Sequence, residues 1–133
     1  MSYVFDFHLA SGILRTRFRD QVTDEEFRDY YNVVRDLAGK IPIKGAILDY
    51  SGVASYEITS AVIREFAASK PTVNNPQFPI LVIAARPHIF GASRMFQILS
   101  NESRPGLRIV KTEEEAFTAL GLHDPQFQPI DHT

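Results

Sequence analysis

The chain has 133 residues, of which 44% are hydrophobic and 23% are charged, and its formal net charge is -2. This length is typical of one domain, and this composition is typical of a folded globular protein. The weakly acidic balance predicts neither nucleic acid nor an anionic membrane as a partner, and the absence of cysteine excludes disulfides, thiolate metal ligands and a cysteine nucleophile.

Two further features bear on location. A chain without cysteine needs no oxidising compartment, so the cytoplasm is the expected location. Residues 1–9 alternate apolar and polar side chains, and they lack the basic flank and long apolar segment of a signal peptide. The most apolar run, residues 79–85, is too short to cross a bilayer. We therefore expect no membrane span.

The first elements expected are two strands. Residues 3–9 and 13–18 have strand patterns and are separated by a short turn, and so short a connection requires an antiparallel hairpin. Arg15, Arg17 and Arg19 share one face of the second strand. That stripe predicts either a solvated face or a surface for an anionic partner.

A helix is expected between Thr23 and Gly39. Thr23 and Glu26 form a capping box, in which the threonine hydroxyl accepts a hydrogen bond from the first turn and the glutamate reaches back. Apolar side chains then recur every three or four residues until Gly39 ends the pattern. We interpret the aromatic stripe of this helix as core rather than as a cofactor-binding motif.

The second half of the chain alternates apolar strands with helices. Residues 44–50 predict a buried strand, a tight polar turn follows it, and a helix is expected over about residues 56–69. Residues 79–85 predict a second buried strand. A loop is expected over residues 86–91, with the next helix opening at residues 91–93.

A short strand at residues 107–111 and a helix between Thr112 and Gly121 complete the pattern. Alternating strands and helices predict parallel strands with right-handed crossovers. The expected fold is a single-domain α/β structure, with a mixed five-stranded sheet, an N-terminal antiparallel hairpin and about four helices. The domain is expected to cover residues 1–122, and residues 123–133 predict a C-terminal surface tail.

One segment carries a family resemblance. Residues 47–53, Ile-Leu-Asp-Tyr-Ser-Gly-Val, resemble the apolar-strand, Asp, x, Ser, Gly, Val segment of STAS domains, the sulfate-transporter and anti-sigma-factor-antagonist fold. The order of strands and helices over residues 3–122 is similar to that superfamily, and residues 86–121 resemble uncharacterised bacterial members of it. The resemblance implies a STAS-like fold and a regulatory role through a protein partner or a homodimer.

The resemblance also raises a question about phosphorylation. STAS antagonists carry an Asp-Ser-Ser-Gly type of motif a few residues beyond this aspartate, and a partner kinase phosphorylates its serine. In this chain those positions fall on Glu57, Ile58, Thr59 and Ser60, so isoleucine stands at the acceptor position. The resemblance thus implies a module that lacks the usual phosphoacceptor serine. Thr59 or Ser60 would substitute only if the helix started a residue or two away.

A ligand site is expected where the central strands end. Ligands of open α/β sheets gather outside the carboxyl ends of the strands, and residues 49–57 and 86–94 should meet there. The candidate ligand-binding residues are Asp49, Tyr50, Ser51, Arg86, His88, Ser93 and Arg94. Arginine side chains and the backbone donors of a helix start favour a small anionic or lipid-like ligand. Alternatively, Arg86 pairs with Asp49 and merely closes the sheet edge.

A partner surface is expected at the same rim. The candidate partner-binding residues are Tyr56, Glu57, Thr59, Ser60 and Phe90. If Phe90 projects beside Tyr56, the two rings form an apolar patch that suits a protein partner, a homodimer or a lipid tail. Alternatively, Phe90 folds under the helix that follows.

Catalytic and metal-binding motifs are weak. His88 with Asp49 or Glu57 offers an acid–base pair, but no serine lies in a Gly-x-Ser-x-Gly elbow. The histidines have no metal-ligand spacing, and there is no glycine-rich phosphate loop; the four are His8, His88, His123 and His132. We therefore expect no metal, no cofactor and a non-catalytic module. The alternatives are a small-molecule-binding domain and an enzyme at the same crevice.

Overall fold

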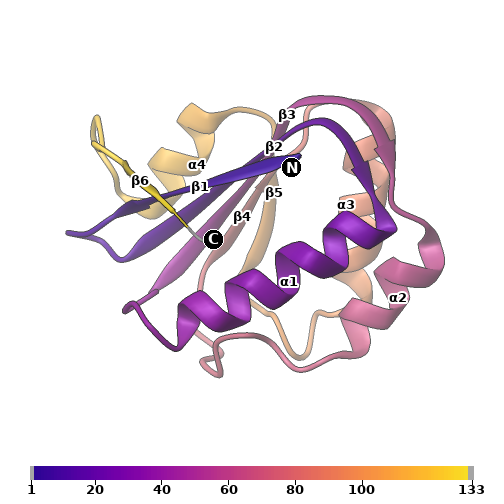
Figure 1. Ribbon diagram of the computed structural model, residues 1–133, viewed down its shortest axis with the longest axis horizontal. Coiled ribbons are helices and arrows are strands. Elements are labelled where there is room, and N and C mark those ends of the chain that lie inside the picture. The colour runs from indigo at the N-terminus through magenta and orange to yellow at the C-terminus, as the bar shows by residue number, and fades with distance from the viewer. Residues whose placement is uncertain (1, 132–133) are drawn as a thin grey trace.

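A six-stranded mixed sheet organises the computed structural model, which describes residues 2–131 (Figure 1). The elements are β1 (Tyr3–His8), β2 (Ile13–Thr23), α1 (Asp24–Ala38), β3 (Gly45–Glu57), α2 (Ser60–Ala68), β4 (Ile80–Ile83), α3 (Pro87–Leu99), β5 (Leu107–Val110), α4 (Glu113–Leu120) and β6 (Gln128–Ile130). Their order across the sheet is β5-β4-β3-β2-β1-β6. The α/β class and the expected number of helices are confirmed, whereas the sequence predicted five strands.

The pairing of strands follows the predicted hairpin and crossovers. β1 is antiparallel to β2, and Gly12 supplies the positive φ of 74° that their turn requires. β2, β3, β4 and β5 are parallel. Ala46 lies opposite Ile80, and Asp49 lies opposite Ile83, so β3 and β4 run side by side in the interior. The segments that follow these two ladders therefore start from the same rim of the sheet.

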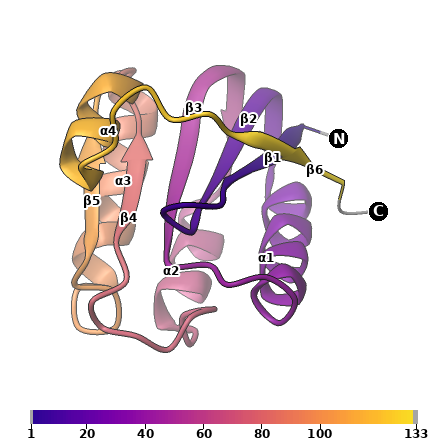
Figure 2. The ribbon, with the colours of Figure 1, turned by 90° about the vertical axis from the view of Figure 1, so that its left-hand side faces the viewer.

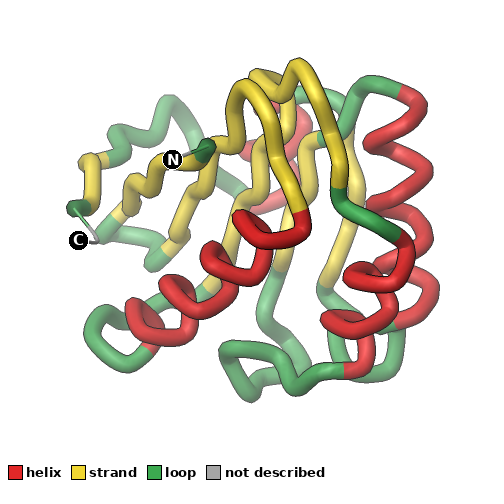
Figure 3. Tube along the Cα trace, turned by 45° about the vertical axis from the view of Figure 1, so that its right-hand side comes forward, coloured by secondary structure: helices red, strands yellow, loops and turns green. Residues whose placement is uncertain are grey.

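β2 and β3 are longer than the sequence predicts. The turn expected after Tyr50 is absent, because both strands continue and stay paired as far as Thr23 and Glu57. Two register shifts, after Arg17 and after Asp20, bend the pair, and such irregularities increase local twist. Figure 3 shows the two strands arching beyond the sheet, each leading towards a helix. We call this paired extension, residues 19–23 and 52–57, the overhang.

Local capping signals predicted two helix starts correctly. The hydroxyl of Thr23 accepts from the backbone nitrogen of Glu26 at 3.3 Å and begins α1. The hydroxyl of Thr112 accepts from the backbone nitrogen of Glu115 at 3.1 Å and begins α4. Gly121, with φ 69°, ends α4 in the left-handed conformation, as its position predicted.

The starts of α2 and α3 differ from the prediction. α2 begins at Ser60 rather than at about residue 56, because the overhang holds the chain in a strand until Glu57. α3 begins at Pro87, since proline at the first helical position lacks a donor that the helix does not need there. Residues 91–93 therefore lie inside α3. The predicted helix start at these residues is wrong, and their backbone donors do not open into a crevice.

Helices α1, α2 and α3 cover one face of the sheet, and α4 covers part of the other; Figure 2 looks onto the second of these faces. We call them the three-helix face and the α4 face. Stacked and edge-to-face rings fill much of the three-helix core, including Tyr3, Phe18, Phe27, Tyr30 and Phe66. None of the helices in the described residues is long and apolar enough to cross a membrane.

The segment expected as a surface tail, residues 123–133, contains the sixth strand. β6 pairs with β1, with Ile130 opposite Phe5. The ring of Phe127 stacks on Phe117 of α4, with centroids 6.0 Å apart. These contacts tie much of the segment to the sheet, while residues 132–133, which complete the predicted tail, lie outside the described residues.

Candidate functional site

The rim at the carboxyl ends of β3 and β4 gathers only part of the predicted site. Tyr56, near the end of the overhang, meets His88 in the first turn of α3. Nε2 of His88 lies 3.4 Å from the carbonyl oxygen of Tyr56, and the two rings are nearly perpendicular with centroids 5.5 Å apart. Arg86 is the exposed N-cap residue of α3 and makes no side-chain capping bond.

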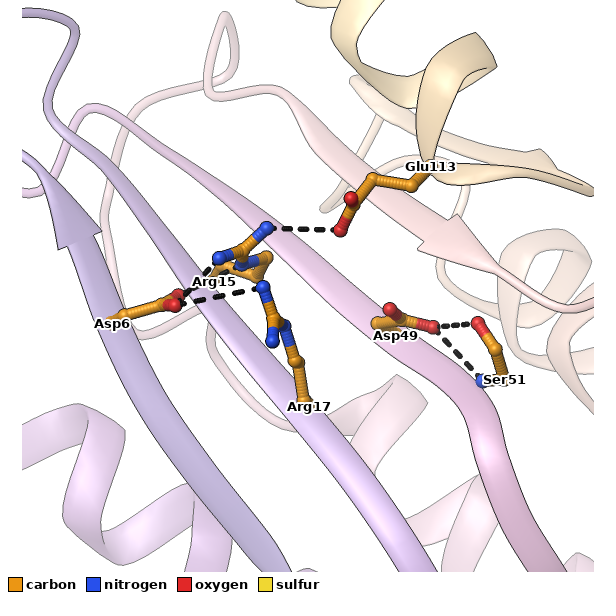
Figure 4. Close-up of polar contacts among 6 residues, drawn as sticks. All are labelled: Asp6, Arg15, Arg17, Asp49, Ser51 and Glu113. Carbon is orange, nitrogen blue, oxygen red and sulfur yellow. Dashed lines mark hydrogen bonds and ion pairs between the residues drawn. The ribbon is translucent and has the colours of Figure 1, made fainter. Parts of the chain in front are cut away.

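Asp49 and Ser51 lie elsewhere, on the α4 face (Figure 4). Asp49 accepts a 2.9 Å hydrogen bond from the backbone nitrogen of Ser51 and a second bond from its hydroxyl. Because side chains alternate along a strand, Asp49 points away from the side occupied by Tyr50. No ion pair joins Arg86 to Asp49 among the described residues. Asp49 and Tyr50, which were both expected to line one crevice, therefore face opposite sides of the sheet.

Arg94 and Phe90 also lie apart from His88. Arg94 is exposed and donates to the side-chain oxygen of Gln97 at 2.6 Å. Arg94 and Phe90 border a hollow against Ile109 of β5. Because α3 starts at Pro87, Arg94 follows His88 by six helical steps of about 100° each, which place the two side chains about 120° apart around the helix axis. The structure does not bring Arg86, His88 and Arg94 to one pocket.

The exposed residues around the start of α2 form a separate surface. The hydroxyl of Thr59 donates to Asp24 at 2.9 Å and accepts from the backbone nitrogen of Val62 at 3.3 Å, so it serves as the N-cap of α2. Ser60, the first helical residue, and Glu57, the last residue of β3, are both exposed. Of the two possible substitutes for the missing acceptor serine, Thr59 is therefore engaged in capping and Ser60 is accessible.

A pocket of about 90 Å³ lies between the three-helix face, its three helices and the loop after α2. The strands contribute Leu14, Thr16, Ala46, Leu48, Tyr50, Tyr56, Ile80, Val82 and Leu107. The helices contribute Phe27, Tyr30, Tyr31, Val34, Ile63, Ala92, Ser93 and Phe96, and the connecting segments contribute Ile43, Ile58, Pro71, Thr72, Val73, Phe78 and Arg104. Two predicted ligand residues, Tyr50 and Ser93, and one predicted partner residue, Tyr56, thus line the same pocket.

The pocket exists because small side chains stand where larger ones would fill the space. Ala46 of β3 and Ala92 of α3 both line it. Ala46 and its neighbour Ile80 of β4 are only half-buried, although both lie on interior strands. On the opposite face of the same strands, Ile47 and Leu81 are 0% and 1% exposed. The free space is therefore specific to the three-helix side.

Arg104 is the one charged side chain among the described residues of the pocket lining. It is 6% exposed, and its guanidinium donates to the carbonyls of Ala67 at 3.4 Å and Ser69 at 3.3 Å, at the end of α2. It also donates to the hydroxyl of Ser103 at 3.2 Å and lies 5.2 Å from the ring centroid of Phe96. No carboxylate of the described residues forms an ion pair with it.

Three tyrosines give the pocket neutral polar groups. Burial raises the pKa of Tyr31, and the charge of Arg104 together with a hydrogen bond from it opposes that rise. Burial raises the pKa of Tyr50, to which the neighbouring Tyr56 adds. Burial also raises the pKa of Tyr56, with a smaller contribution from the charge of Asp24. All three phenols are protonated at neutral pH, so each hydroxyl is able to donate a hydrogen bond.

The sequence analysis did not predict that Arg104 and Tyr31 line this pocket. Arg104 stands in a polar loop before Pro105 and Gly106, and nothing in that pattern signals burial. Tyr31 belongs to an aromatic stripe that we interpreted as core. The one available signal was the placement of Ala46 and Ala92 among large apolar residues, which is weak because alanine is common in buried elements.

No group of three or more His, Asp or Glu residues able to hold a metal ion occurs within residues 2–131. In comparisons with known proteins, no protein-family model and no curated protein matches the chain. The class that the geometry defines is an α/β domain with an apolar pocket between its sheet and three of its helices.

Proposed function

We propose that this protein is a non-catalytic binding module that takes up a small apolar molecule between the sheet and helices α1, α2 and α3. The observation that carries the proposal is the unfilled pocket that starts at the N-terminal ends of β3 and β4, where Ala46, Leu48 and Ile80 stay half-buried. Protein interiors are normally packed as densely as organic crystals. An unfilled space at the centre of a sheet is therefore most simply explained by an occupant.

The energetics favour an apolar occupant. Removing apolar surface from water contributes about 25 cal/mol for each Å². A ligand that covers roughly 100 Å² of the pocket walls thus gains about 2.5 kcal/mol from the protein side alone. Nearly all the lining side chains are aliphatic or aromatic, with a few hydroxyls and one guanidinium. Such a lining, with a small number of polar groups, is typical of small-molecule sites.

The proposal is tested by isothermal titration calorimetry against alkanols, fatty acids and alkylbenzenes. We expect saturable binding with one site, and we expect Ala46→Leu to abolish it, because the added side chain occupies the pocket. Ala61→Leu is the matched control, since Ala61 is exposed on α2 and outside the lining. Ala92→Leu fills the pocket from α3 and replaces Ala46→Leu if that variant does not fold. Failure of every compound to bind, or equal binding by the filled variants, would refute the proposal.

A protein-interaction role in the manner of STAS domains is the second candidate. The order of strands and helices and the segment from Ile47 to Val53 support it, as does the accessible surface at Glu57 and Ser60. The chain lacks the usual acceptor serine, so this role would not depend on phosphorylation of that residue. We place either function in the cytoplasm, the compartment expected for a chain without cysteine.

Self-association provides the test of this second role. If the surface at Glu57 and Ser60 mediates a homodimer, sedimentation equilibrium will show a mass that rises with protein concentration, and Ser60→Arg will reduce that rise. Arg108→Ala, on the exposed side of β5 far along the sheet, is the control. A constant monomer mass would leave only an interaction with a different protein, and binding unchanged by Ser60→Arg would exclude this surface.

A further inference from the structure

We propose that the ligand is a single-chain carboxylate, such as a fatty acid, whose head group binds Arg104; this rests on the proposed function of the pocket. The observation behind it is a buried arginine that lines an apolar pocket and has no carboxylate partner among the described residues. An arginine side chain keeps its charge at neutral pH. A buried charge is costly unless an opposite charge compensates it.

The protein compensates the charge of Arg104 only in part. Its guanidinium approaches the last carbonyls of α2, and a helix C-terminus carries roughly half a unit of negative charge. Those contacts measure 3.3 and 3.4 Å, whereas charge-assisted N–H···O bonds are usually about 2.7–2.9 Å. These contacts, with the hydroxyls of Ser103 and Tyr31 and the ring of Phe96, solvate the guanidinium but bring no full negative charge to it, so an anion would complete its environment. The phenol of Tyr31, already coupled to Arg104, is placed to donate a further hydrogen bond.

Because Arg104 is the one charged residue in the described pocket lining, the site favours a head group with a single negative charge. A carboxylate carries one negative charge and accepts two parallel hydrogen bonds from a guanidinium. A phosphate monoester carries about 1.5 to 2 negative charges near neutral pH, and the described pocket lining offers Arg104 alone to balance them. A carboxylate therefore matches the charge of the site, and a phosphate exceeds it.

The shape of the pocket selects a slender tail. Its volume of about 90 Å³ is smaller than the roughly 150 Å³ apolar cavity that holds a benzene ring, so it encloses only the first carbons of an alkyl chain, and the rest of a longer chain lies along the side of the pocket that is open to solvent. It extends along β3 from Ala46 to Tyr50, a rise of about 13 Å at roughly 3.3 Å per residue. Arg104 stands just before β5 and near the end of α2, at the end of the pocket that Ala46 and Leu107 mark. An alkyl chain that starts at Arg104 would run towards Tyr50.

The experiment compares decanoate, decanol and decyl phosphate by calorimetry, each below its critical micelle concentration. We expect the wild-type protein to bind decanoate at least about tenfold more tightly than decanol, the factor that a hydrogen-bonded charge typically contributes. Arg104→Met should remove that preference, so that the variant binds decanoate no more tightly than decanol. Arg104→Lys should keep part of the preference for decanoate, since lysine retains the positive charge but lacks the two parallel N–H donors of a guanidinium. Arg94→Met, at an exposed position outside the pocket, is the matched control and should behave as wild type.

The outcomes separate this inference from the function on which it rests. If decanol and decanoate bind equally and Arg104→Met changes neither, the pocket binds apolar molecules and the carboxylate assignment is wrong. If decyl phosphate binds most tightly, the head group is wrong. If no compound binds, both proposals fail. Should Arg104→Met not fold, the NMR signal of the Arg104 Nε–H group in the wild-type protein decides, because decanoate should shift it and decanol should not.

Discussion

Two buried arginines, one on each side of the sheet, are used in opposite ways. Arg15, 5% exposed, donates to Asp6 at 2.6 and 2.8 Å and to Glu113 at 2.9 Å, and its guanidinium lies 4.0 Å from the ring centroid of Phe127 (Figure 4). Arg104, 6% exposed, has long contacts to carbonyls and no carboxylate among the described residues. Burial alone therefore does not define the role of a charge; its partners do.

The network of Arg15 closes the α4 face. Burial lowers the pKa of Arg15, but hydrogen bonds and charges from Asp6 and Glu113 outweigh burial, so the pKa is raised. The network joins β1, β2 and α4, while Phe127 brings the C-terminal segment over it. The short helix α4 covers only part of this face. The ion pairs of Arg15 and the ring of Phe127 cover strand residues that α4 does not reach.

The three-helix face has more covering elements and yet is less completely filled. Ala46 and Ile80 are half-buried there, while Ile47 and Leu81 on the α4 face are almost fully buried. The three-helix face therefore has more covering helices, and yet it holds both the pocket and Arg104, which has no carboxylate partner among the described residues. That combination fits a binding face opposite a structural one, and the predictions below test the division.

The largest effect is expected at alkaline pH, on the three-helix face. All five tyrosines of the chain pack in or against its core, and burial raises the pKa of each. Above about pH 10 the unfolded chain loses phenol protons that the folded chain keeps, so stability falls as pH rises. The slope is at most about 1.4 kcal/mol per pH unit for each tyrosine, and the contributions of the five have the same sign. Phenolate absorbance and circular dichroism should therefore change together. Phenolate formation while the fold remains intact would contradict the prediction.

The next effect tests the α4 face. Arg15→Met leaves Asp6 largely buried without its main partner, which should lower the free energy of unfolding by about 3 kcal/mol in urea titrations. Arg17→Met is the control, because Arg17 is 48% exposed and lies 3.9 Å from Asp6. It should cost less than about 1 kcal/mol. Ligand binding per folded molecule should be the same in both variants. Equal losses of stability would show that Arg15 is not a structural charge.

The sequence predicted features that depend on neighbouring residues better than features that depend on distant ones. Local signals were reliable: the capping residues Thr23 and Thr112 and the terminal Gly121 all act as their types imply, because their hydrogen bonds lie within a few residues. The segment around Gly52 was misread as a turn. It remains a strand because β2 runs beside it, and that pairing joins residues about thirty positions apart. Non-local pairing overrode a local preference for a turn.

Side-chain burial was the less predictable part of the site. Tyr50, Tyr56 and Ser93 were chosen for a rim of the sheet, and they line the pocket beneath it instead. Arg104 and Arg15 carry no local mark that separates one from the other or from an exposed arginine. Their roles depend on carboxylates and carbonyls supplied by distant elements, so they follow only from tertiary structure.

A smaller effect is expected at Gly106, where the wall of the pocket meets β5. A Cβ atom at this position would collide with the carbonyl oxygen of Phe78, which lines the pocket. Because the oxygen that the new methyl group would meet belongs to the backbone, Gly106→Ala should force the loop after α2 to shift, at a cost of about 1–3 kcal/mol. Decanoate affinity should fall with stability. Unchanged affinity in calorimetry would show that this loop does not shape the binding site.

The smallest effect separates stability from binding on the three-helix face. Gly91 lies exposed within α3, and a Cβ atom there would meet nothing within 4 Å. Gly91→Ala should raise the free energy of unfolding by about 0.5–1 kcal/mol, because alanine loses less backbone freedom in a helix. Calorimetry should show unchanged decanoate affinity, since the new methyl group points away from the pocket lining. If affinity falls instead, binding needs α3 to move, and the pocket is not a preformed site.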